Sequence, residues 1–532
     1  MDHQFSRSQT FHKRAARSAQ GIVAAQHRLA AEVGAQVLAQ GGDCVDAVVA
    51  TSFAIGALEP WMSGIGGVGT MVLYRAAEGR AEVIDFGGIS PQGLDPRNYP
   101  LAAEGRSASL FPWRRVVDDR NETGATAVAV PGVVDGMGQA HARHGRLPWR
   151  DLVQPAADLA RKGLLVDWFT TLNIAGAAAE LRRQPTAAAE FLIDGLPPSA
   201  AWGGREVLRL PRPRYAATLE RIAEGGARSF YDGELAQQIA AEVAAAGGSL
   251  SASDLARYRA RVSPALAIPY RGAVVHATPE LTAGPTLAQT LHQLQGWQPA
   301  GSAPDAQAYA AYAQALQHAY RQRLQDMGDA EGRRAIGAEH LAPPTCTTHF
   351  SVVDAQGNMA AVTQTLLGIF GSKFVTPDTG ILLNNGIMWF DPEPGRSNSL
   401  AGGRRCLANY TPVIAEMAPG RHLAVGASGG RRILPAVAQL LSFVIDHGMD
   451  LQQAFDTPRI DASEGPLVLV DDRLEPATQA ALAQQFDTEA IALQTVPMKF
   501  ACPSAVLRDG GLNQGATELF NPWADAVSAD RP

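Results

Sequence analysis

The stretch TTHFSVVDAQGNMAAVTQT, residues 347–365, predicts a hairpin of two strands joined by a short turn at 354–358. If the strands pair symmetrically about Gln356, Thr347 lies opposite Thr365 on the same face, with Cβ atoms about 5 Å apart. One hydroxyl can then hydrogen-bond the other, although a slip of one residue would break the pairing. Two opposed threonines are also an ordinary strand pair, so this feature alone does not indicate a function.

A second element is AVGASGGRRILPAV, residues 424–437. It predicts a strand that runs into Gly429-Gly430, followed by a helical segment. Backbone N–H groups at the start of a helix form a ready anion site and a candidate oxyanion hole. The alternative is a tight turn that simply requires small residues.

Strands are predicted at both ends of the chain and helices in the middle. A strand at 21–25 precedes two helical segments, 27–42 and 44–60, of which the second is apolar on all sides, as in a buried helix. Residues 135–330 have mainly helical patterns. The economical solution is an α/β (α+β) protein with one mixed sheet system assembled from both ends, covered by helices and carrying a helical insertion.

Gly64, Gly66 and Gly69 match the spacing G-x-G-x-x-G of dinucleotide sites. That fingerprint requires a strand before the glycines and a helix after them. Here a helix precedes and a strand follows, so the pattern indicates a close-packed turn.

The composition is that of a folded globular protein. The 532 residues are 46% hydrophobic and 18% charged, with a net charge of −7 and a pI near 6.0, and we find no basic stripe that would predict nucleic-acid binding. The four cysteines are scattered, which predicts neither a zinc site nor a disulfide framework, and no metal or organic cofactor is implied.

The N-terminal segment and the segment before Cys346 show no pattern of a helix or a strand. Residues 1–18 lack an apolar segment behind their basic residues, so they predict a mobile tail and not a signal peptide. No segment is long enough to span a bilayer, and a cytoplasmic location is the default expectation. Residues 333–345, RRAIGAEHLAPPT, predict an exposed loop.

Over about residues 20–525 the sequence resembles the γ-glutamyltransferase family of N-terminal-nucleophile hydrolases. The matching stretches are GGDCVDAVVATSFAIGALEPWMSGIGG (41–67), AVPGVVDGM (129–137), FYDGELAQQIA (230–240), 347–365, GILLNNGIMWFDPEPG (380–395) and GASGGRRI (426–433). The resemblance implies a four-layer αββα sandwich made as a proenzyme. It implies cleavage between Cys346 and Thr347, giving a large subunit (19–346 after the tail) and a small subunit (347–532) that stay associated.

The implied chemistry explains why a threonine stands there. After cleavage Thr347 carries a hydroxyl nucleophile and a free α-amine, whose reference pKa of about 7.7–8.0 suits a general base. The resemblance makes Thr365 the partner of the nucleophile and places Gly429 and Gly430 in the oxyanion hole. An acyl-enzyme formed from a small-molecule amide would be resolved by water or by an acceptor amine.

The family's substrate clamp is altered in this chain. Gly87 replaces the arginine that holds the glutamyl α-carboxylate, and Trp389 replaces the acidic residue that holds the α-amine. Further differences lie at Leu367 (family asparagine), at Gly386 (family glutamine), and at Ala408 and Asn409 (paired serines). A charged head group without partners would be desolvated at a cost of several kcal/mol. The changes predict an acyl group that is not an ordinary γ-glutamyl group.

Three alternatives stay open. The clamp could have moved to Arg404, Arg405 or Arg431, with Arg431 beside the oxyanion turn also compatible with an anionic substrate or with a solvated surface. The substrate could be a non-glutamyl amide, as for the oxamate amidohydrolases of this family. The chain could also be an inactive member that acts as a binding protein.

Overall fold

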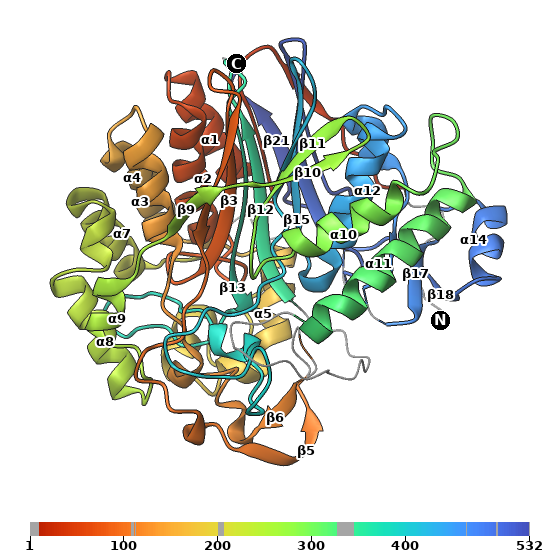
Figure 1. Cartoon of the computed structure of the whole chain (residues 1–532). Helices are drawn as coiled ribbons and strands as arrows, with labels where there is room; N and C mark the ends of the chain where they lie inside the picture. Colours follow the sequence, from red (N-terminus) through yellow and green to blue (C-terminus); the bar gives the residue numbers. More distant parts are fainter. Residues whose placement is uncertain are drawn as a thin grey trace.

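The computed structural model describes residues 10–107, 111, 113–200, 207–326, 345–463, 465–495 and 498–530. Within these ranges, two antiparallel seven-stranded sheets lie face to face with helices on both outer sides (Figure 1). The four-layer αββα architecture predicted from the sequence is confirmed.

The first sheet consists of strands from both ends of the chain. Its order is β21 (Asp525–Ser528), β2 (Ile22–Ala25), β12 (Thr345–Val353), β13 (Met359–Gly368), β3 (Val68–Arg75), β4 (Arg80–Phe86) and β9 (Arg261–Pro264).

The second sheet is assembled in the same way. Its order is β1 (Ala16–Ser18), β20 (Leu512–Thr517), β19 (Cys502–Asp509), β15 (Arg421–Ser428), β14 (Val413–Ala418), β11 (Ala273–Ala277) and β10 (Leu266–Tyr270).

Three smaller sheets lie outside the sandwich. They are β5 (Leu101–Arg106) with β6 (Arg114–Val116), β7 (Leu164–Leu165) with β8 (Arg209–Leu210), and β16 (Ile460–Asp461) with β17 (Leu467–Asp471) and β18 (Asp487–Ile491).

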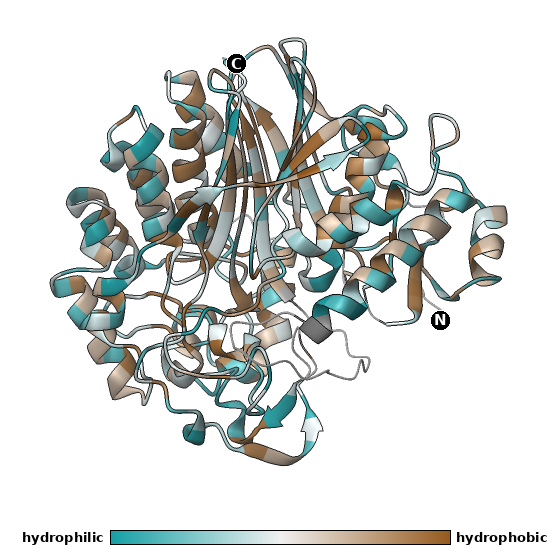
Figure 2. Ribbon diagram, viewed as in Figure 1, coloured by the Kyte–Doolittle hydropathy of each residue, from teal (hydrophilic) through white to brown (hydrophobic). Residues whose placement is uncertain are grey.

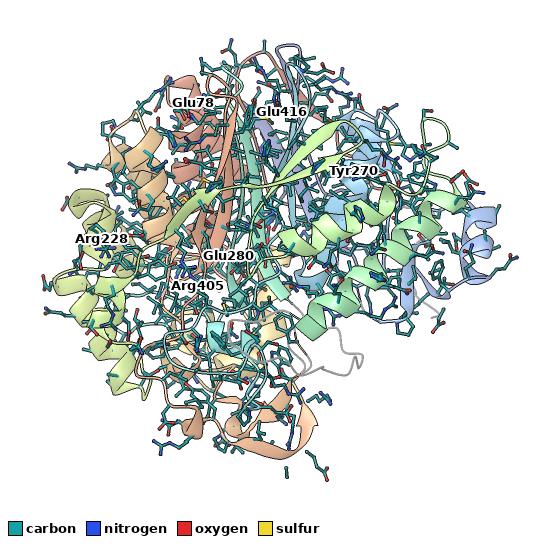
Figure 3. All side chains as sticks on the ribbon, viewed as in Figure 1. Glu78, Arg228, Tyr270, Glu280, Arg405 and Glu416 are labelled. Carbon is teal, nitrogen blue, oxygen red and sulfur yellow. The ribbon has the colours of Figure 1, made fainter. Side chains whose placement is uncertain are left out.

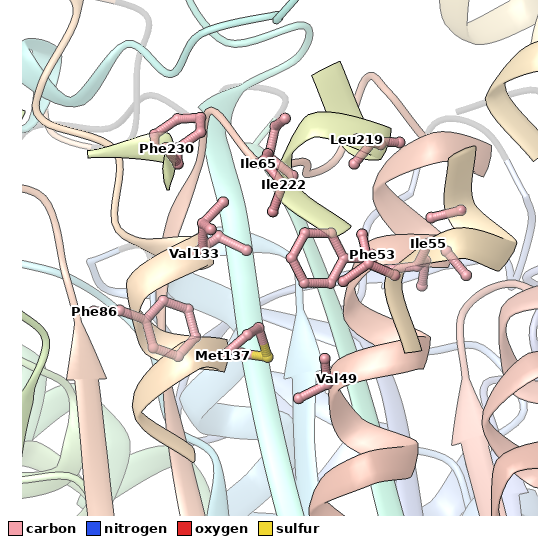
Figure 4. Packing of buried hydrophobic residues seen from close by; sticks show 14 of the residues in the cluster. Val49, Phe53, Ile55, Ile65, Phe86, Val133, Met137, Leu219, Ile222 and Phe230 are labelled. Atoms are coloured by element: carbon pink, nitrogen blue, oxygen red, sulfur yellow. The ribbon is translucent and has the colours of Figure 1, made fainter. Parts of the chain in front are cut away.

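The helices on the outer face of the first sheet form a double layer. Helix α2 packs against the sheet, and all of its residues are buried because further helices cover its other side, which explains why its sequence is apolar all round. Figure 4 shows the contact between α2, α3, α7 and strand β4 through Phe53, Met137, Ile222 and Phe86. The helices of this side are α1 (Arg28–Ala39), α2 (Cys44–Leu58), α3 (Val133–His144), α4 (Trp149–Lys162), α7 (Pro213–Gly225), α8 (Glu234–Ala245) and α9 (Ala252–Arg257).

The remaining helices cover the second sheet or one end of the sandwich. Helices α10 (Gly284–Leu294), α11 (Ala306–Asp326), α12 (Ile433–Ile445) and α13 (Leu451–Asp456) share a core with the second sheet. Helices α5 (Trp168–Leu181) and α6 (Pro185–Phe191) pack below Cys346, and α14 (Pro476–Ala483) contacts α11. Hydrophobic residues follow the central strands, whereas hydrophilic residues gather at the periphery (Figure 2).

Two expectations from the sequence need correction. Residues 261–277 are not part of a helical insertion, because β9 is the edge strand of the first sheet, and β11 and β10 are the last two strands of the second. Their short alternating pattern is hard to distinguish from the helical patterns around it. Residues 13–18 are also not part of a mobile tail, because β1 pairs with β20 and the Lys13 ammonium donates a hydrogen bond to the Ala524 carbonyl at 2.8 Å. Residues 1–9 and most of the predicted loop 333–345 lie outside the described residues.

Candidate active site

The predicted pair of threonines is present on the hairpin of β12 and β13. The register is symmetric, with Val353 opposite Met359 and His349 opposite Thr363, as far as Thr348 opposite Gln364. The pairing then shifts between Thr348 and Cys346, so Thr347 sits at an irregularity of the strand. Its Oγ1 lies 3.3 Å from Oγ1 of Thr365.

Both hydroxyls are directed at the carbonyl that precedes Thr347. The Thr347 hydroxyl donates to the Cys346 oxygen at 2.6 Å, and the Thr365 hydroxyl donates to the same oxygen. The Leu367 N–H in turn donates to Thr365 Oγ1 at 2.8 Å, which fixes the rotamer of Thr365. All of these groups are buried, so the carbonyl is polarised by hydrogen bonds in a site of low dielectric constant.

A buried acid, Glu59, braces the strand next to the nucleophile. Its Oε2 accepts a hydrogen bond from the Thr348 hydroxyl at 3.2 Å. Burial raises the pKa of Glu59 to about 8, so the side chain is a neutral acid at pH 7. Sequence reasoning missed this residue, although a single acid at the end of an apolar helix, in GALEPW, was the available signal.

The nearby histidine and cysteine do not act as a base and a nucleophile. His349 is fully buried, its Nδ1 contacts Thr363 Oγ1 at 2.9 Å, and burial lowers its pKa to about 3. Burial also raises the pKa of the Cys346 thiol. The α-amine that cleavage would release from Thr347 is therefore the base to consider.

The glycine turn has the predicted geometry. Strand β15 ends at Ser428, Gly429 and Gly430 have φ values of 128° and 62°, and a short 3-10 turn leads into α12. A Cβ atom on Gly429 would lie 2.9 Å from the Cα atom of Ala501. The turn packs beside β12, and its role as the oxyanion hole stays a prediction.

An arginine from another part of the sequence lies beside Gly87. A Cβ atom at Gly87 would be 3.5 Å from Nη1 of Arg405, and the same Nη1 contacts Asp85 Oδ2 at 2.9 Å (Figure 3). The Tyr258 hydroxyl donates to the Gly87 carbonyl at 2.9 Å, which holds the turn in place. A guanidinium group thus lies beside Gly87, although residue 87 itself has no side chain.

The position of the missing acid is apolar and aromatic. Trp389 is 4% exposed and packs with Leu367 and Ala408, and its ring centroid is 5.6 Å from that of Tyr410. Among the described residues, its indole nitrogen Nε1 has no hydrogen-bond partner. At Gly386, a Cβ atom would lie 2.5 Å from the Cβ atom of Ala129, so a longer side chain does not fit there.

The other two predicted substrate residues are engaged within the protein. Asn409 Oδ1 accepts from Arg323 Nη2 at 2.8 Å, and Arg323 is itself buried. Arg431 is 8% exposed, donates to the Ser463 carbonyl at 2.6 Å and lies over the Tyr320 ring at 5.6 Å. The alternative of a solvated Arg431 is therefore wrong, and a role of Arg431 in substrate binding stays a prediction.

Within the described ranges, no group of three or more His, Cys, Asp or Glu side chains could hold a metal ion. In the same ranges, no helix combines the length and hydropathy that a membrane span requires.

Comparison with known proteins identifies the class. A family model described as gamma-glutamyltranspeptidase matches residues 30–345 and 332–524. The chain belongs to this family of N-terminal-nucleophile hydrolases, and its homologues are enzymes.

Individual relatives carry two kinds of name. The Acylase ACY 1 proenzyme of Pseudomonas sp. (strain V22) is 35% identical over 503 residues, covering 89% of this chain and 88% of the relative. The glutathione hydrolase proenzyme of Escherichia coli (strain K12) is 31% identical over 489 residues, covering 83% and 81%. The fold also matches a crystal structure of cephalosporin acylase from Bacillus halodurans, with a TM-score of 0.84, 24% identity and full coverage of both chains.

Proposed function

We propose that this protein is an autoprocessed amide hydrolase whose preferred acyl group carries a carboxylate but lacks the α-ammonium of a γ-glutamyl group. Two observations support the proposal. Arg405 lies beside Gly87, and Trp389 stands where the family has the acidic residue that holds the α-amine. The occurrence of acylases among the relatives supports it.

Maturation begins at the carbonyl that both threonines contact. Oγ1 of Thr347 attacks the Cys346 carbonyl carbon, the C–N bond breaks, and the proton of the hydroxyl passes to the departing amine. Water then hydrolyses the resulting ester, which leaves a carboxylate on Cys346 and a free amine on Thr347. The two fragments would remain associated, because strands from before and after this bond pair with one another in both sheets.

Turnover repeats the same chemistry on a substrate. The α-amine of Thr347 accepts the proton of its own hydroxyl, and Oγ1 attacks the substrate carbonyl. The proton passes to the leaving amine, and an acyl ester remains on Thr347. Water releases the acid and restores the hydroxyl, while an acceptor amine would give a new amide by the same route.

The geometry limits the acyl group. Gly87 follows Phe86 on β4, which is separated from Thr347 on β12 by β13 and β3, so the two positions are about 14 Å apart at the usual strand spacing. A short dicarboxylic chain spans this distance together with the side chains at its ends. A guanidinium group binds a carboxylate in a fork-like manner, whereas Trp389 offers an ammonium no negative charge.

The test compares substrates that differ in one group. The kcat/KM for glutaryl anilide is expected to exceed that for γ-glutamyl anilide, which differs only by its α-amine, and that for pentanoyl anilide, which lacks the carboxylate. A higher kcat/KM for γ-glutamyl anilide would show that other residues bind the γ-glutamyl head group and that the substrate is still a γ-glutamyl compound. Turnover of oxamate above all three would favour the oxamate-type alternative.

The retention of the Thr347–Thr365 pair argues against an inactive binding protein. A sample that is processed but hydrolyses none of these amides would support an inactive binding protein instead.

A further inference from the structure

A cavity of about 670 Å³, whose lining includes neither Thr347 nor Thr365, lies between the start of α1, the end of α4 and the segment 522–525. Its volume is in the range of small-molecule sites. A ligand of this cavity would be distinct from the amide substrate proposed above.

The side chains at this cavity are strongly cationic. Five basic residues line it against a single carboxylate, that of Asp525, although the chain as a whole has a net charge of −7. A local excess of one sign in a concave site concentrates ligands of the opposite charge. The basic residues are Lys13, Arg14, Arg28, Lys162 and Arg209.

Two of these cations are not engaged with the protein. Among the described residues, Arg14 and Lys162 have neither a hydrogen bond nor an ion pair of their side chains, and both are exposed. By contrast, Arg28 contacts Glu32 at 2.8 Å and Asp525 at 3.5 Å. The cavity therefore retains uncompensated positive charge.

The wall of the cavity also offers one buried donor. His27 is 9% exposed, and its Nδ1 accepts a hydrogen bond from the Leu29 N–H at 3.2 Å. Burial lowers the pKa of His27 to about 3, so the ring is neutral and its proton must be on Nε2. No partner for Nε2 is found within the described part of the chain.

Apolar groups form the rest of the wall. Leu29, Leu58, Leu164 and Leu165 line the cavity together with Trp523, whose ring meets that of His27 edge-on at 4.7 Å. Such a surface binds the hydrocarbon or aromatic part of a ligand. It would be poorly matched to a small inorganic anion alone.

We infer that this cavity is a binding site for an amphiphilic organic anion, with an aliphatic or aromatic body against Trp523 and the leucines and an acidic group toward His27 Nε2 and the basic rim. Because the site is a concave cavity of limited volume, the ligand is a single small molecule and not a membrane surface.

The experiment uses the full-length protein and 8-anilinonaphthalene-1-sulfonate as the probe, with decanoate as a competitor. We expect saturable one-to-one binding by fluorescence titration, with tryptophan-to-probe energy transfer that is reduced in Trp523→Phe. Displacement by decanoate is expected, because the apolar part and the acidic group are the features recognised.

Matched variants locate the site. Lys162→Glu should weaken binding about five- to tenfold, because it reverses a rim charge, whereas Arg150→Glu, on the same helix but outside the cavity, should leave it unchanged. His27→Phe keeps a ring against Trp523 and removes the donor, and should also weaken binding.

Equal affinities of Lys162→Glu, His27→Phe and the unmodified protein would overturn the inference. Binding to anionic phosphatidylglycerol vesicles without saturable binding of either small probe would overturn it as well, since it would indicate a membrane-facing surface.

Discussion

Oγ1 of Thr347 lies 3.3 Å from Oγ1 of Thr365, and both hydroxyls hydrogen-bond to the carbonyl oxygen of Cys346. The nucleophile, its partner and the bond to be cut therefore meet at one irregular position of a buried strand pair. This arrangement has consequences that can be measured separately for processing, stability and substrate choice.

Replacing Thr365 by valine should slow processing and lower kcat by about 100-fold or more, because the polarised carbonyl loses a donor in a buried site. The variant should also lose about 1–3 kcal/mol of stability, since the Leu367 N–H is left without its acceptor. The measurements are the rate of fragment formation by mass spectrometry and urea unfolding. Thr363→Val on the same strand, which removes the contact to His349, should lose stability without losing processing.

The neutral Glu59 makes stability depend on pH. Its pKa is about 8 in the folded protein, above the ordinary value of 4.5, so the folded state binds more protons than the unfolded state between these limits. Its contribution to stability therefore falls as the pH rises across this window, by at most about 1.4 kcal/mol per pH unit.

Glu59→Gln keeps an acceptor for Thr348 and cannot ionise. The free energy of unfolding of the unmodified protein should therefore fall relative to that of this variant as the pH rises from 6 to 8. The exposed Glu78→Gln provides the control (Figure 3). Parallel pH profiles of all three proteins would show that Glu59 is already ionised at pH 6.

The clamp can be tested at Arg405. Arg405→Lys keeps the charge but loses the fork-like geometry, so KM for glutaryl anilide should rise about tenfold while KM for pentanoyl anilide stays the same. The neighbouring Arg404→Lys should change neither value. An equal rise for both substrates in Arg405→Lys would mean that Arg405 acts on the fold of the site and not on the carboxylate.

The glycine turn is expected to tolerate no side chain at Gly429. Gly429→Ala would place a Cβ atom 2.9 Å from Ala501, in a backbone conformation with φ of 128°, and should lower both stability and kcat. Gly420→Ala is matched to it, because Gly420 also has a positive φ of 77° but no atom near the added Cβ. A normal kcat in a folded Gly429→Ala protein would contradict an oxyanion hole at this turn.

The sequence predicted the elements whose patterns are local. The hairpin register, the buried helix α2 and the strand–turn–helix at Gly429-Gly430 follow from alternation, all-round hydrophobicity and paired glycines. Strands β9 to β11 were missed, because their short alternating patterns are hard to distinguish from the helical patterns around them.

The rest of the site depends on contacts between distant segments. Arg405 comes to Gly87 across 318 positions of the sequence, and Glu59 comes to Thr348 across 289. The raised pKa of Glu59 is a result of burial, which no local pattern specifies. The chemistry of the hairpin could therefore be predicted from local sequence, whereas the residues around Gly87 and Thr348 could be identified only from the fold.

Cleavage of the chain before Thr347 can be tested by measuring the intact mass of the purified protein and of Thr347→Ala. We expect two fragments, residues 1–346 and 347–532, in the unmodified protein and a single chain in the variant. An unmodified protein that stays a single chain on incubation, or a variant that is cut at the same bond, would contradict it.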